Sequence, residues 1–399
     1  MLSASIFILA ACVGDQSPDG GWAAPVISGD HIYIGSKDGR LTRFSLNDDG
    51  RFDNSFAFPA AALDTLGPIY GTPRVDGGRV FGASYDCDNL DCEAQVFAVS
   101  AEDARPIWPE VTFKLRTRVV GAVAVSGDTV LFGTSEIDDE LDPSTAEGYL
   151  YALDARPDAP QRLLWRFPTT GYVWGTPVVS DGVVYFGDLD GVFYAVSLGG
   201  DGADDDAGRE LWRFSTGAAI VTEPLIADGM IYIGNFNDAF YALNIATRQA
   251  AVSGSVLQGP GEWSFNSDGW FWATPLIHEG VLYIGTLNGK FYALDPATGV
   301  ERWANPGSVK GQIVGGPVVI TEAGGTALAV PSGSDNIGVF DARTGSELNG
   351  FATDGGVKAQ LITDGRFLYA HTIGDDLIKF DIPTRGVIFC IDAETGLSC

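Results

Sequence analysis

Residues with side chains suited to covalent or metal chemistry are few in this sequence. It has three histidines and five cysteines among 399 residues. The histidines, His31, His278 and His371, are far apart and lack the spacing of metal ligands. No H-E-x-x-H, G-x-S-x-G, C-x-x-C-H or Gly-rich phosphate-loop motif occurs. The sequence therefore predicts no catalytic centre and no metal site, and we expect the histidines to be structural.

The cysteines divide into one single residue and two local pairs. Cys12 ends an apolar run, Cys87 and Cys92 are five residues apart, and Cys390 and Cys399 flank the last turn of the chain. Metal binding by the C-x4-C segment is disfavoured, because no second pair has a suitable spacing. Two local disulfides would leave only Cys12 unpaired, which is typical of an oxidising compartment. The sequence thus predicts a disulfide within each pair.

Residues 1–12 form a short apolar segment that ends Leu9-Ala10-Ala11-Cys12. This segment resembles a bacterial lipoprotein signal, in which the lipobox cysteine is diacylated and becomes the mature N-terminus. The resemblance implies lipid attachment at Cys12, and Val13 after it favours the outer membrane. Residues 13–21 would then be a flexible polar tether. The alternative is that residues 1–12 form a first strand of the fold.

The chain is strongly acidic, with a formal net charge of −28 from 52 acidic and 24 basic residues. Such a surface repels nucleic acid phosphates and anionic lipid head groups, so we expect neither as a partner. The charge serves solubility or, alternatively, a partner with a basic patch. Acidic insertions such as Asp201 and Asp204–Asp206 lack the spacing of a Ca²⁺ loop, and we expect solvated loops there.

The elements that must position these residues are short β-strands. The stretch from Trp174 to Trp212 contains four apolar runs separated by turn signals, including Asp181-Gly182 and Asp190-Gly191. Asp-Gly between β-branched or aromatic residues favours a type I′ hairpin turn, which needs positive φ at both central positions. The stretch predicts a four-stranded antiparallel meander. Because such a sheet cannot cover its own faces, it must stack against similar sheets.

Similar units recur along the whole chain. Each contains an anchor residue just before its strands, and the anchors are Pro25, Pro73, Val123, Pro177, Pro224, Pro275, Pro317 and Gln360. Their mean spacing is about 48 residues, and the apolar patterns, rich in Val, Ile, Tyr, Phe and Gly, exclude helical repeats. The sequence thus predicts an all-β fold, an eight-bladed β-propeller of four-stranded antiparallel blades, as a single domain over residues 22–399.

The units share the pattern T-P-V-V-x-D-G-V-V-Y-x-G, then D-G-x-F-Y-A-L-D, a T-G turn and a Trp. This pattern resembles the repeat of pyrroloquinoline-quinone (PQQ) enzymes and their non-catalytic relatives. The glycine of the second strand is matched by Gly187, Gly234 and Gly285, and the tryptophan that docks one blade on the next by Trp108, Trp165, Trp212 and Trp303. Units one, five and seven lack this tryptophan. Either Asp375–Phe380 or Gly386–Ile391 can form the last strand, which leaves the closure of the ring open.

In a propeller the innermost strands converge on the axis, so equivalent positions form rings around a channel. The candidate mouth residues on these rings are the aromatic Trp22, Tyr70, Trp174, Trp270 and Trp272 and the charged Glu223, Arg118 and Lys358. We expect them either to plug the channel or to grip a peptide segment or planar ligand. A second candidate is a contact loop in the insertion Ser253–Asp268, which carries Trp263 and Phe265.

A short lipid-anchored ring without the additions of the quinoprotein dehydrogenases is similar to the non-catalytic, BamB-like lipoprotein branch of this family. That resemblance implies a scaffold on the periplasmic side of the outer membrane. It would hold other envelope proteins, including the β-barrel assembly machinery, by loops on one face or by β-augmentation. We expect no enzyme activity and no cofactor. The alternatives are an oxidoreductase dependent on PQQ and Ca²⁺, and an envelope sensor or carbohydrate-binding propeller.

Overall fold

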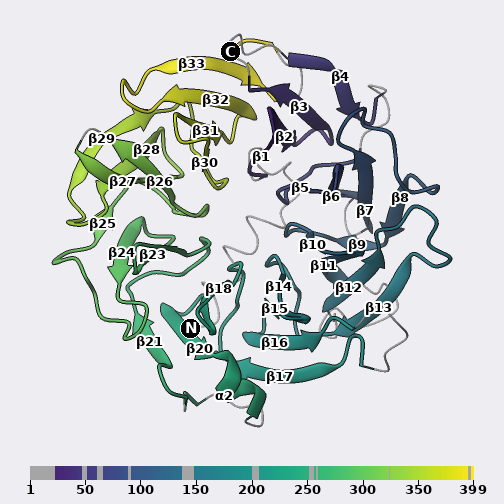
Figure 1. Cartoon of the computed structure of the whole chain (residues 1–399), viewed down its shortest axis with the longest axis horizontal. Coiled ribbons are helices and arrows are strands. Elements are labelled where there is room, and N and C mark those ends of the chain that lie inside the picture. Colours follow the sequence, from purple (N-terminus) through teal and green to yellow (C-terminus); the bar gives the residue numbers. More distant parts are fainter. Residues whose placement is uncertain are drawn as a thin grey trace.

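The computed structural model describes residues 23–46, 52–60, 66–88, 91–136, 148–199, 206–250, 256–257, 259–322, 324–393 and 397–399. Eight sheets follow one another in chain order around a central axis and form a closed ring (Figure 1). The fold is therefore the all-β, eight-bladed β-propeller that the sequence predicts. The predicted signal segment and tether, together with Cys12 and Trp22, lie outside the described residues.

Each blade is an antiparallel meander whose strands run in sequence from the axis to the rim. Blades one to four comprise β1 (Val26–Ser28), β2 (His31–Gly35), β3 (Leu41–Ser45) and β4 (Phe52–Phe58); β5 (Arg74–Asp76), β6 (Arg79–Asp88), β7 (Asp91–Ser100) and β8 (Thr112–Leu115); β10 (Ala124–Ser126), β11 (Thr129–Glu136), β12 (Gly148–Asp154) and β13 (Leu163–Pro168); and β14 (Val178–Ser180), β15 (Val183–Gly187), β16 (Val192–Ser197) and β17 (Glu210–Ser215). Blades five to eight comprise β18 (Leu225–Ala227), β19 (Met230–Gly234), β20 (Ala239–Asn244) and β21 (Trp263–Asn266); β22 (Leu276–His278), β23 (Val281–Gly285), β24 (Lys290–Leu294) and β25 (Gly307–Ser308); β26 (Val318–Glu322), β27 (Gly325–Val330), β28 (Asn336–Asp341) and β29 (Glu347–Ala352); and β30 (Ile362–Thr363), β31 (Phe367–His371), β32 (Asp376–Asp381) and β33 (Val387–Asp392).

Two elements depart from the four-stranded pattern. The short β9 (Thr117–Arg118) pairs with β11, so the sheet of blade three has five strands. The helix α2 (Ile245–Ala250) follows β20 in blade five. No helix among the described residues is long and apolar enough to cross a membrane.

The two predicted Asp-Gly turns of blade four differ. At Asp181-Gly182 both residues have positive φ, 50° and 74°, as a type I′ hairpin requires. At Asp190-Gly191 only the glycine does, so the type I′ prediction is wrong there. The buried carboxylate of Asp188 shapes this turn instead, because it accepts hydrogen bonds from the Val192 N–H (2.8 Å) and the Thr170 hydroxyl (2.7 Å).

A tryptophan near the outer strand docks most blades on the next one. Its indole N–H donates to a carbonyl oxygen in the turn after the third strand of the following blade. These bonds join Trp108 to Ala155 (3.3 Å), Trp165 to Leu198 (3.3 Å) and Trp303 to Ala342 (3.1 Å). The tryptophans matched from the sequence at these three positions therefore do dock the blades.

Blade five has a docking tryptophan as well, contrary to the sequence-based prediction. Trp263 lies in β21, is 8% exposed, and donates its indole N–H to the Pro296 carbonyl oxygen at 3.0 Å. Phe265 is half-buried on the same strand, with its ring centroid 5.2 Å from that of Tyr292. The prediction of an exposed contact loop at Trp263 and Phe265 is wrong, because α2 and the residues after it displace the tryptophan from its usual spacing.

Blades one and eight lack the tryptophan and use a cation in its place. The third-strand position held by Ala195 in blade four is Arg43 in blade one and Lys379 in blade eight. Arg43 donates to the Ala101 carbonyl oxygen (2.8 Å) and Lys379 to that of Leu46 (3.3 Å). In blade four a tryptophan of the outer strand packs beside the small Ala195. In blades one and eight the long Arg43 and Lys379 side chains fill this space themselves.

The ring closes between blades eight and one, each built from one continuous stretch of chain. Both sequence candidates for the last strand are strands: the first is β32 and the second is β33, at the rim. His371 is fully buried at this junction, where Nδ1 donates to the Ala23 carbonyl oxygen (2.8 Å) and Nε2 contacts Asp375 Oδ1 (2.7 Å). The main-chain N–H of Lys37 donates to the other carboxylate oxygen of Asp375 (3.3 Å). His371 therefore has the structural role expected of it.

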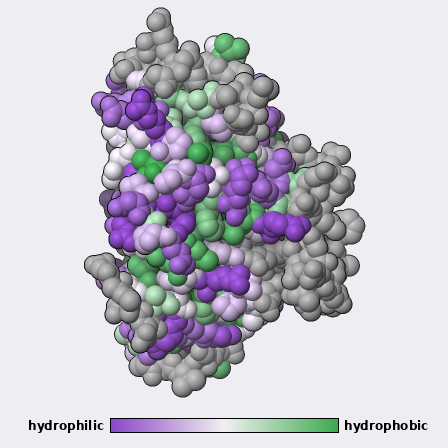
Figure 2. All heavy atoms as spheres, turned by 90° about the vertical axis from the view of Figure 1, so that its right-hand side faces the viewer, coloured by the Kyte–Doolittle hydropathy of each residue, from purple (hydrophilic) through white to green (hydrophobic). Residues whose placement is uncertain are grey.

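The outer surface of the ring is mixed in polarity. On the side shown in Figure 2, hydrophobic areas are small and lie between hydrophilic ones. The rim of blade eight is more apolar: Val387 and Ile388 on β33 are 54% and 45% exposed, and Leu397 beside the C-terminal disulfide is exposed as well. An apolar outer strand of this kind is one that proteins usually guard with charges.

Candidate functional site

The segments that enter the innermost strands of blades two to eight surround a cavity of about 180 Å³ on the axis. Most of its lining residues lie one to three positions before the anchors: Tyr70, Gly71, Thr72, Val120, Gly121, Ala122, Trp174, Thr176, Val221, Glu223, Trp272, Thr274, Val314, Gly315, Gly316 and Lys358, with Tyr85 and Gln360. Glycine is needed where the backbones converge, since a Cβ on Gly71 would lie 2.5 Å from the Gly121 carbonyl oxygen. We call this cavity the mouth.

Aromatic side chains at blades two, four and six give the mouth an apolar lining. Tyr70 and Tyr85 lie together, with ring centroids 4.9 Å apart. Trp174 is fixed by its indole N–H, which donates to the Ser135 hydroxyl at 2.8 Å. Trp272 lies against Phe236, with centroids 5.6 Å apart. Such preset rings present a large contact area at low entropic cost, as binding sites for peptides and planar ligands do.

An ion pair connects opposite parts of the mouth. Arg74, the first residue of β5 in blade two, lies 3.0 Å from the Glu223 carboxylate of blade five. Both side chains are partly exposed, so the pair contributes roughly 0–1 kcal/mol to stability. Its larger effect is to neutralise Glu223 inside the channel. Lys358 adds a further positive charge to the lining.

The structure brings five of the predicted mouth residues together: Tyr70, Trp174, Trp272, Glu223 and Lys358 line the cavity. Two others lie elsewhere. Trp270 stacks on Phe236 at the edge, with ring centroids 5.3 Å apart and planes 15° apart, and Arg118 turns away to a disulfide.

Sequence reasoning missed three residues of this site. Arg74 follows its anchor directly, and its place on an innermost strand was a usable signal. Tyr85 lies on β6, which with ten residues is longer than the second strands of the other blades, and Phe236 lies in the turn between β19 and β20. No spacing rule tied either to the axis.

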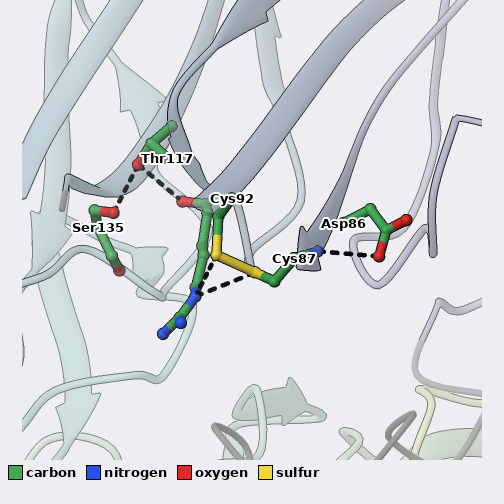
Figure 3. Close-up of a disulfide and its surroundings, with 6 residues drawn as sticks. Asp86, Cys87, Cys92, Thr117 and Ser135 are labelled. Carbon is green, nitrogen blue, oxygen red and sulfur yellow. Dashed lines mark hydrogen bonds between the residues drawn. A yellow bond between two sulfur atoms is a disulfide. The ribbon is translucent and has the colours of Figure 1, made fainter. Parts of the chain in front are cut away.

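Both predicted disulfides are present. Cys87 and Cys92 join β6 to β7, and Cys390 and Cys399 join β33 to the C-terminal residues. Figure 3 shows the first of them, with Asp86 on one side and Thr117 and Ser135 on the other. The Arg118 guanidinium contacts both of its sulfur atoms.

The mouth does not fit PQQ, the cofactor after which the repeat is named. PQQ carries three carboxylates and needs several cations, whereas the only cations among the described residues around the cavity are Lys358 and Arg74, and Arg74 is paired with Glu223. Within the described residues, the one cluster with metal-ligand geometry is Asp376, Cys390 and Cys399, whose cysteines are joined as a disulfide. We therefore derive no chemical step at either place.

Eight PQQ-like blades around an aromatic mouth define this protein as a PQQ-like β-propeller. The family model described as "Outer membrane protein assembly factor BamB" matches residues 16–157 and 202–398, and the chain belongs to this family. No curated protein matches the sequence.

Two solved structures have the same fold. BamB from Moraxella catarrhalis is 15% identical, with a TM-score of 0.63 over 90% of this chain and 92% of that one. The computationally designed Ika8 protein is 13% identical, with a TM-score of 0.62 over 91% of this chain and 98% of that one. At these identities the likeness concerns the fold alone.

Proposed function

We propose that this protein is a non-catalytic scaffold that assists the assembly of outer-membrane β-barrel proteins. Its membership in the family of the assembly factor BamB is the observation that carries the proposal. The protein would act by holding partner proteins, not by transforming a substrate. The described residues support this, because the charged side chains at the axis are the Arg74–Glu223 ion pair and Lys358, and the described residues that line the cavity include no nucleophile–base pair.

The mouth is the part of the surface that we assign to partner binding. Interface energy concentrates in a few aromatic and arginine residues at the centre of a contact. Trp272 and Tyr70 are half-buried aromatic residues of this kind, and both belong to the cavity lining. A partner loop that enters the mouth would pack an apolar side chain between them.

The site of action that we propose is the periplasmic side of the outer membrane, with the chain anchored through a lipid on Cys12. The lipobox-like Leu9-Ala10-Ala11-Cys12 supports this, as does the presence of two disulfides, which fits an oxidising compartment. Substituting Cys12→Ser should abolish incorporation of labelled palmitate. Labelling that persists in this variant would contradict the lipid anchor.

The scaffold function is tested by affinity purification from cell envelopes that contain barrel-assembly components. We expect the tagged chain to retain these components and the variant Trp272→Ala to lose them at least about tenfold, as expected for a central aromatic contact. Val300→Ala is the control, because Val300 is 64% exposed and lies outside the cavity lining. Equal retention by all three proteins would remove the mouth from the proposal, and no retention by the unmodified chain would remove the scaffold function.

A second candidate function is the binding of a saccharide or of a planar ligand. The observation that favours it is a group of three half-buried aromatic residues at the edge of the mouth, in which Phe236 stacks on Trp270 and is tilted against Trp272. Aromatic side chains with a small number of polar groups are typical of the lining of ligand-binding pockets. Calorimetric titration with envelope oligosaccharides separates this function from the scaffold, since only a ligand-binding propeller would show heat that Trp270→Ala removes.

A further inference from the structure

The Cys87–Cys92 disulfide closes a hairpin that borders the mouth. β6 and β7 have ten residues each and pair from Arg79–Ser100 out to Asp88–Asp91, with the two cysteines directly opposite each other near the tip. Tyr85 stands two residues before Cys87 on the same strand and lines the mouth. The state of this disulfide therefore bears on one wall of the cavity.

A guanidinium lies against the sulfur atoms of this disulfide. Arg118 Nε donates to Cys92 Sγ at 3.1 Å and to Cys87 Sγ at 3.4 Å. Among the described residues Arg118 makes no ion pair, so these sulfur contacts are the ones that its side chain has there. A cation beside a cysteine stabilises the thiolate, which makes that sulfur a better leaving group in thiol–disulfide exchange.

The two sulfur atoms differ in access. Cys87 is half-buried, whereas Cys92 is 3% exposed. An external thiolate can therefore reach Cys87, while the sulfur held by the shorter contact to Arg118 is the one that departs. The accessible sulfur atom is that of Cys87, and the sulfur atom that is stabilised as a leaving group is that of Cys92. Exchange requires this arrangement, in which one sulfur is attacked and the other departs.

We propose that Cys87–Cys92 is a thiol–disulfide exchange site, and that its partner is a dithiol, either a small molecule or a dithiol oxidoreductase. A thiolate of the dithiol attacks Cys87 Sγ, a mixed disulfide forms, and the Cys87–Cys92 bond breaks with its electron pair on Cys92 Sγ beside Arg118. The second thiol of the dithiol then attacks its own sulfur in the mixed disulfide and releases Cys87. The dithiol ends as a disulfide and the cysteine pair as two thiols, so atoms and electrons balance.

The second disulfide of the chain provides an internal comparison with the opposite charge. Cys399 Sγ lies 3.2 Å from the carboxylate of Asp376. Burial and the nearby Asp392 raise the pKa of Asp376. A carboxylate beside this sulfur opposes a thiolate there, whereas the guanidinium beside Cys92 favours one. Cys399 is exposed, so access alone would make this disulfide the first to be reduced. The two physical effects predict opposite orders of reduction.

Contacts continue from the exchange site to the mouth. Arg118 belongs to β9 and is followed two residues later by Val120, a mouth residue. The adjacent Thr117 donates its hydroxyl to the Ser135 carbonyl oxygen (2.6 Å), and the Ser135 hydroxyl accepts the indole N–H of Trp174. Loss of the disulfide frees the hairpin tip and Arg118, and thereby loosens this wall. A role of this disulfide in regulating partner binding rests on the proposed function, whereas the exchange chemistry itself does not.

The test is the reduction of the purified full-length chain by dithiothreitol at pH 8, quenched by alkylation and read by peptide mass spectrometry. We expect Cys87–Cys92 to be reduced about tenfold faster than Cys390–Cys399, the ratio expected from one charge-assisted contact. Arg118→Gln should slow the first reaction about tenfold and leave the second unchanged. Arg118→Lys, which keeps the charge, should restore much of the rate.

Three results would overturn the proposal. Faster reduction of Cys390–Cys399 in the unmodified chain would mean that solvent access, and not the neighbouring charge, sets the order of reduction. An unchanged rate in Arg118→Gln would remove the role of the guanidinium, and a parallel change of both disulfides would indicate general unfolding.

Coupling to the mouth is measured separately, as faster amide hydrogen exchange over Thr117–Val120 after selective reduction. Unchanged exchange there would refute the coupling. None of these measurements needs a barrel-assembly partner, so their failure is distinct from failure of the scaffold function.

Discussion

Replacing Trp212 by phenylalanine should cost less stability than replacing Trp303 by phenylalanine, although both are docking tryptophans. The indole N–H of Trp303 donates to the Ala342 carbonyl oxygen at 3.1 Å. The indole N–H of Trp212 is buried and has no hydrogen-bond partner among the described residues. The acceptor is missing because the equivalent residue of blade five, Ile245, begins α2, where carbonyl oxygens turn into the helix.

The difference between the two variants can be estimated from hydrogen bonding. Both substitutions remove the same ring atoms from buried sites, so their cavity contributions largely cancel. Trp303→Phe also loses a hydrogen bond with a net contribution of roughly 1 kcal/mol. The Ala342 carbonyl oxygen keeps its bond from the Tyr283 hydroxyl (3.0 Å) and is not left unpaired. Trp212→Phe removes an unpaired buried donor, whose presence costs roughly 1–3 kcal/mol. We therefore expect Trp303→Phe to cost roughly 2–4 kcal/mol more than Trp212→Phe.

The assay is equilibrium unfolding in urea, followed by far-ultraviolet circular dichroism and by fluorescence. Free energies are compared when the two transitions coincide and the slopes agree among variants. Trp165→Phe is a second reference, because its indole N–H is bonded to the Leu198 carbonyl oxygen. If Trp212→Phe costs as much as Trp303→Phe, the assignment of an unpaired donor to blade four is wrong.

Three further perturbations test the closure and the rim of blade eight. Lys379→Ala should lower the free energy of unfolding by roughly 2–4 kcal/mol in urea titrations, because it empties a buried site, whereas Lys379→Arg, the residue that blade one uses, should keep most of the stability. Burial, with nearby Asp392, raises the pKa of Asp376, so folding favours its protonated form and that stability is lost as the pH rises through the raised pKa. Asp376→Asn should therefore unfold at a higher temperature than the unmodified chain at pH 7 and at the same temperature at pH 3; equal midpoints at both would count against this reasoning. Ile388→Lys should reduce aggregation in light scattering by guarding an apolar outer strand, and Leu164→Lys, at an equally exposed position of β13 (45%), should change it less because the charged Arg166 already guards that strand.

The repeat architecture could be predicted from the sequence because its signals are local. Asp181-Gly182 sets a hairpin by backbone conformation alone, and repeated anchors fix the number of blades. The offset from the anchor then placed Tyr70, Trp174 and Trp272 on one ring without knowledge of the fold's dimensions. These residues line the mouth because strict repetition turns equal spacing into equal depth along the axis.

The features that sequence reasoning missed depend on contacts between distant parts of the chain. The Arg74–Glu223 pair joins residues 149 apart, and their blades meet only across the closed ring. Arg118 has the sequence position of a mouth residue, but its side chain lies against a disulfide that no spacing ties to it. Trp263 was read as an exposed residue because an insertion hid its register. For the first two the partner in space was unknown, whereas for Trp263 the register itself was misread.

At several junctions between blades, different residues fill the same space and donate the same kind of hydrogen bond. Where the turn after the third strand presents a buried carbonyl oxygen to the preceding blade, that oxygen needs a donor. Trp303 supplies an indole N–H to Ala342, Arg43 a guanidinium to Ala101, and Lys379 an ammonium to Leu46. In blades one and eight a cation occupies the third-strand position that is alanine in blade four, and this one side chain both fills the space and donates. The missing tryptophans of units one and eight therefore mark a different solution to the same packing problem, and the ring stays closed without them.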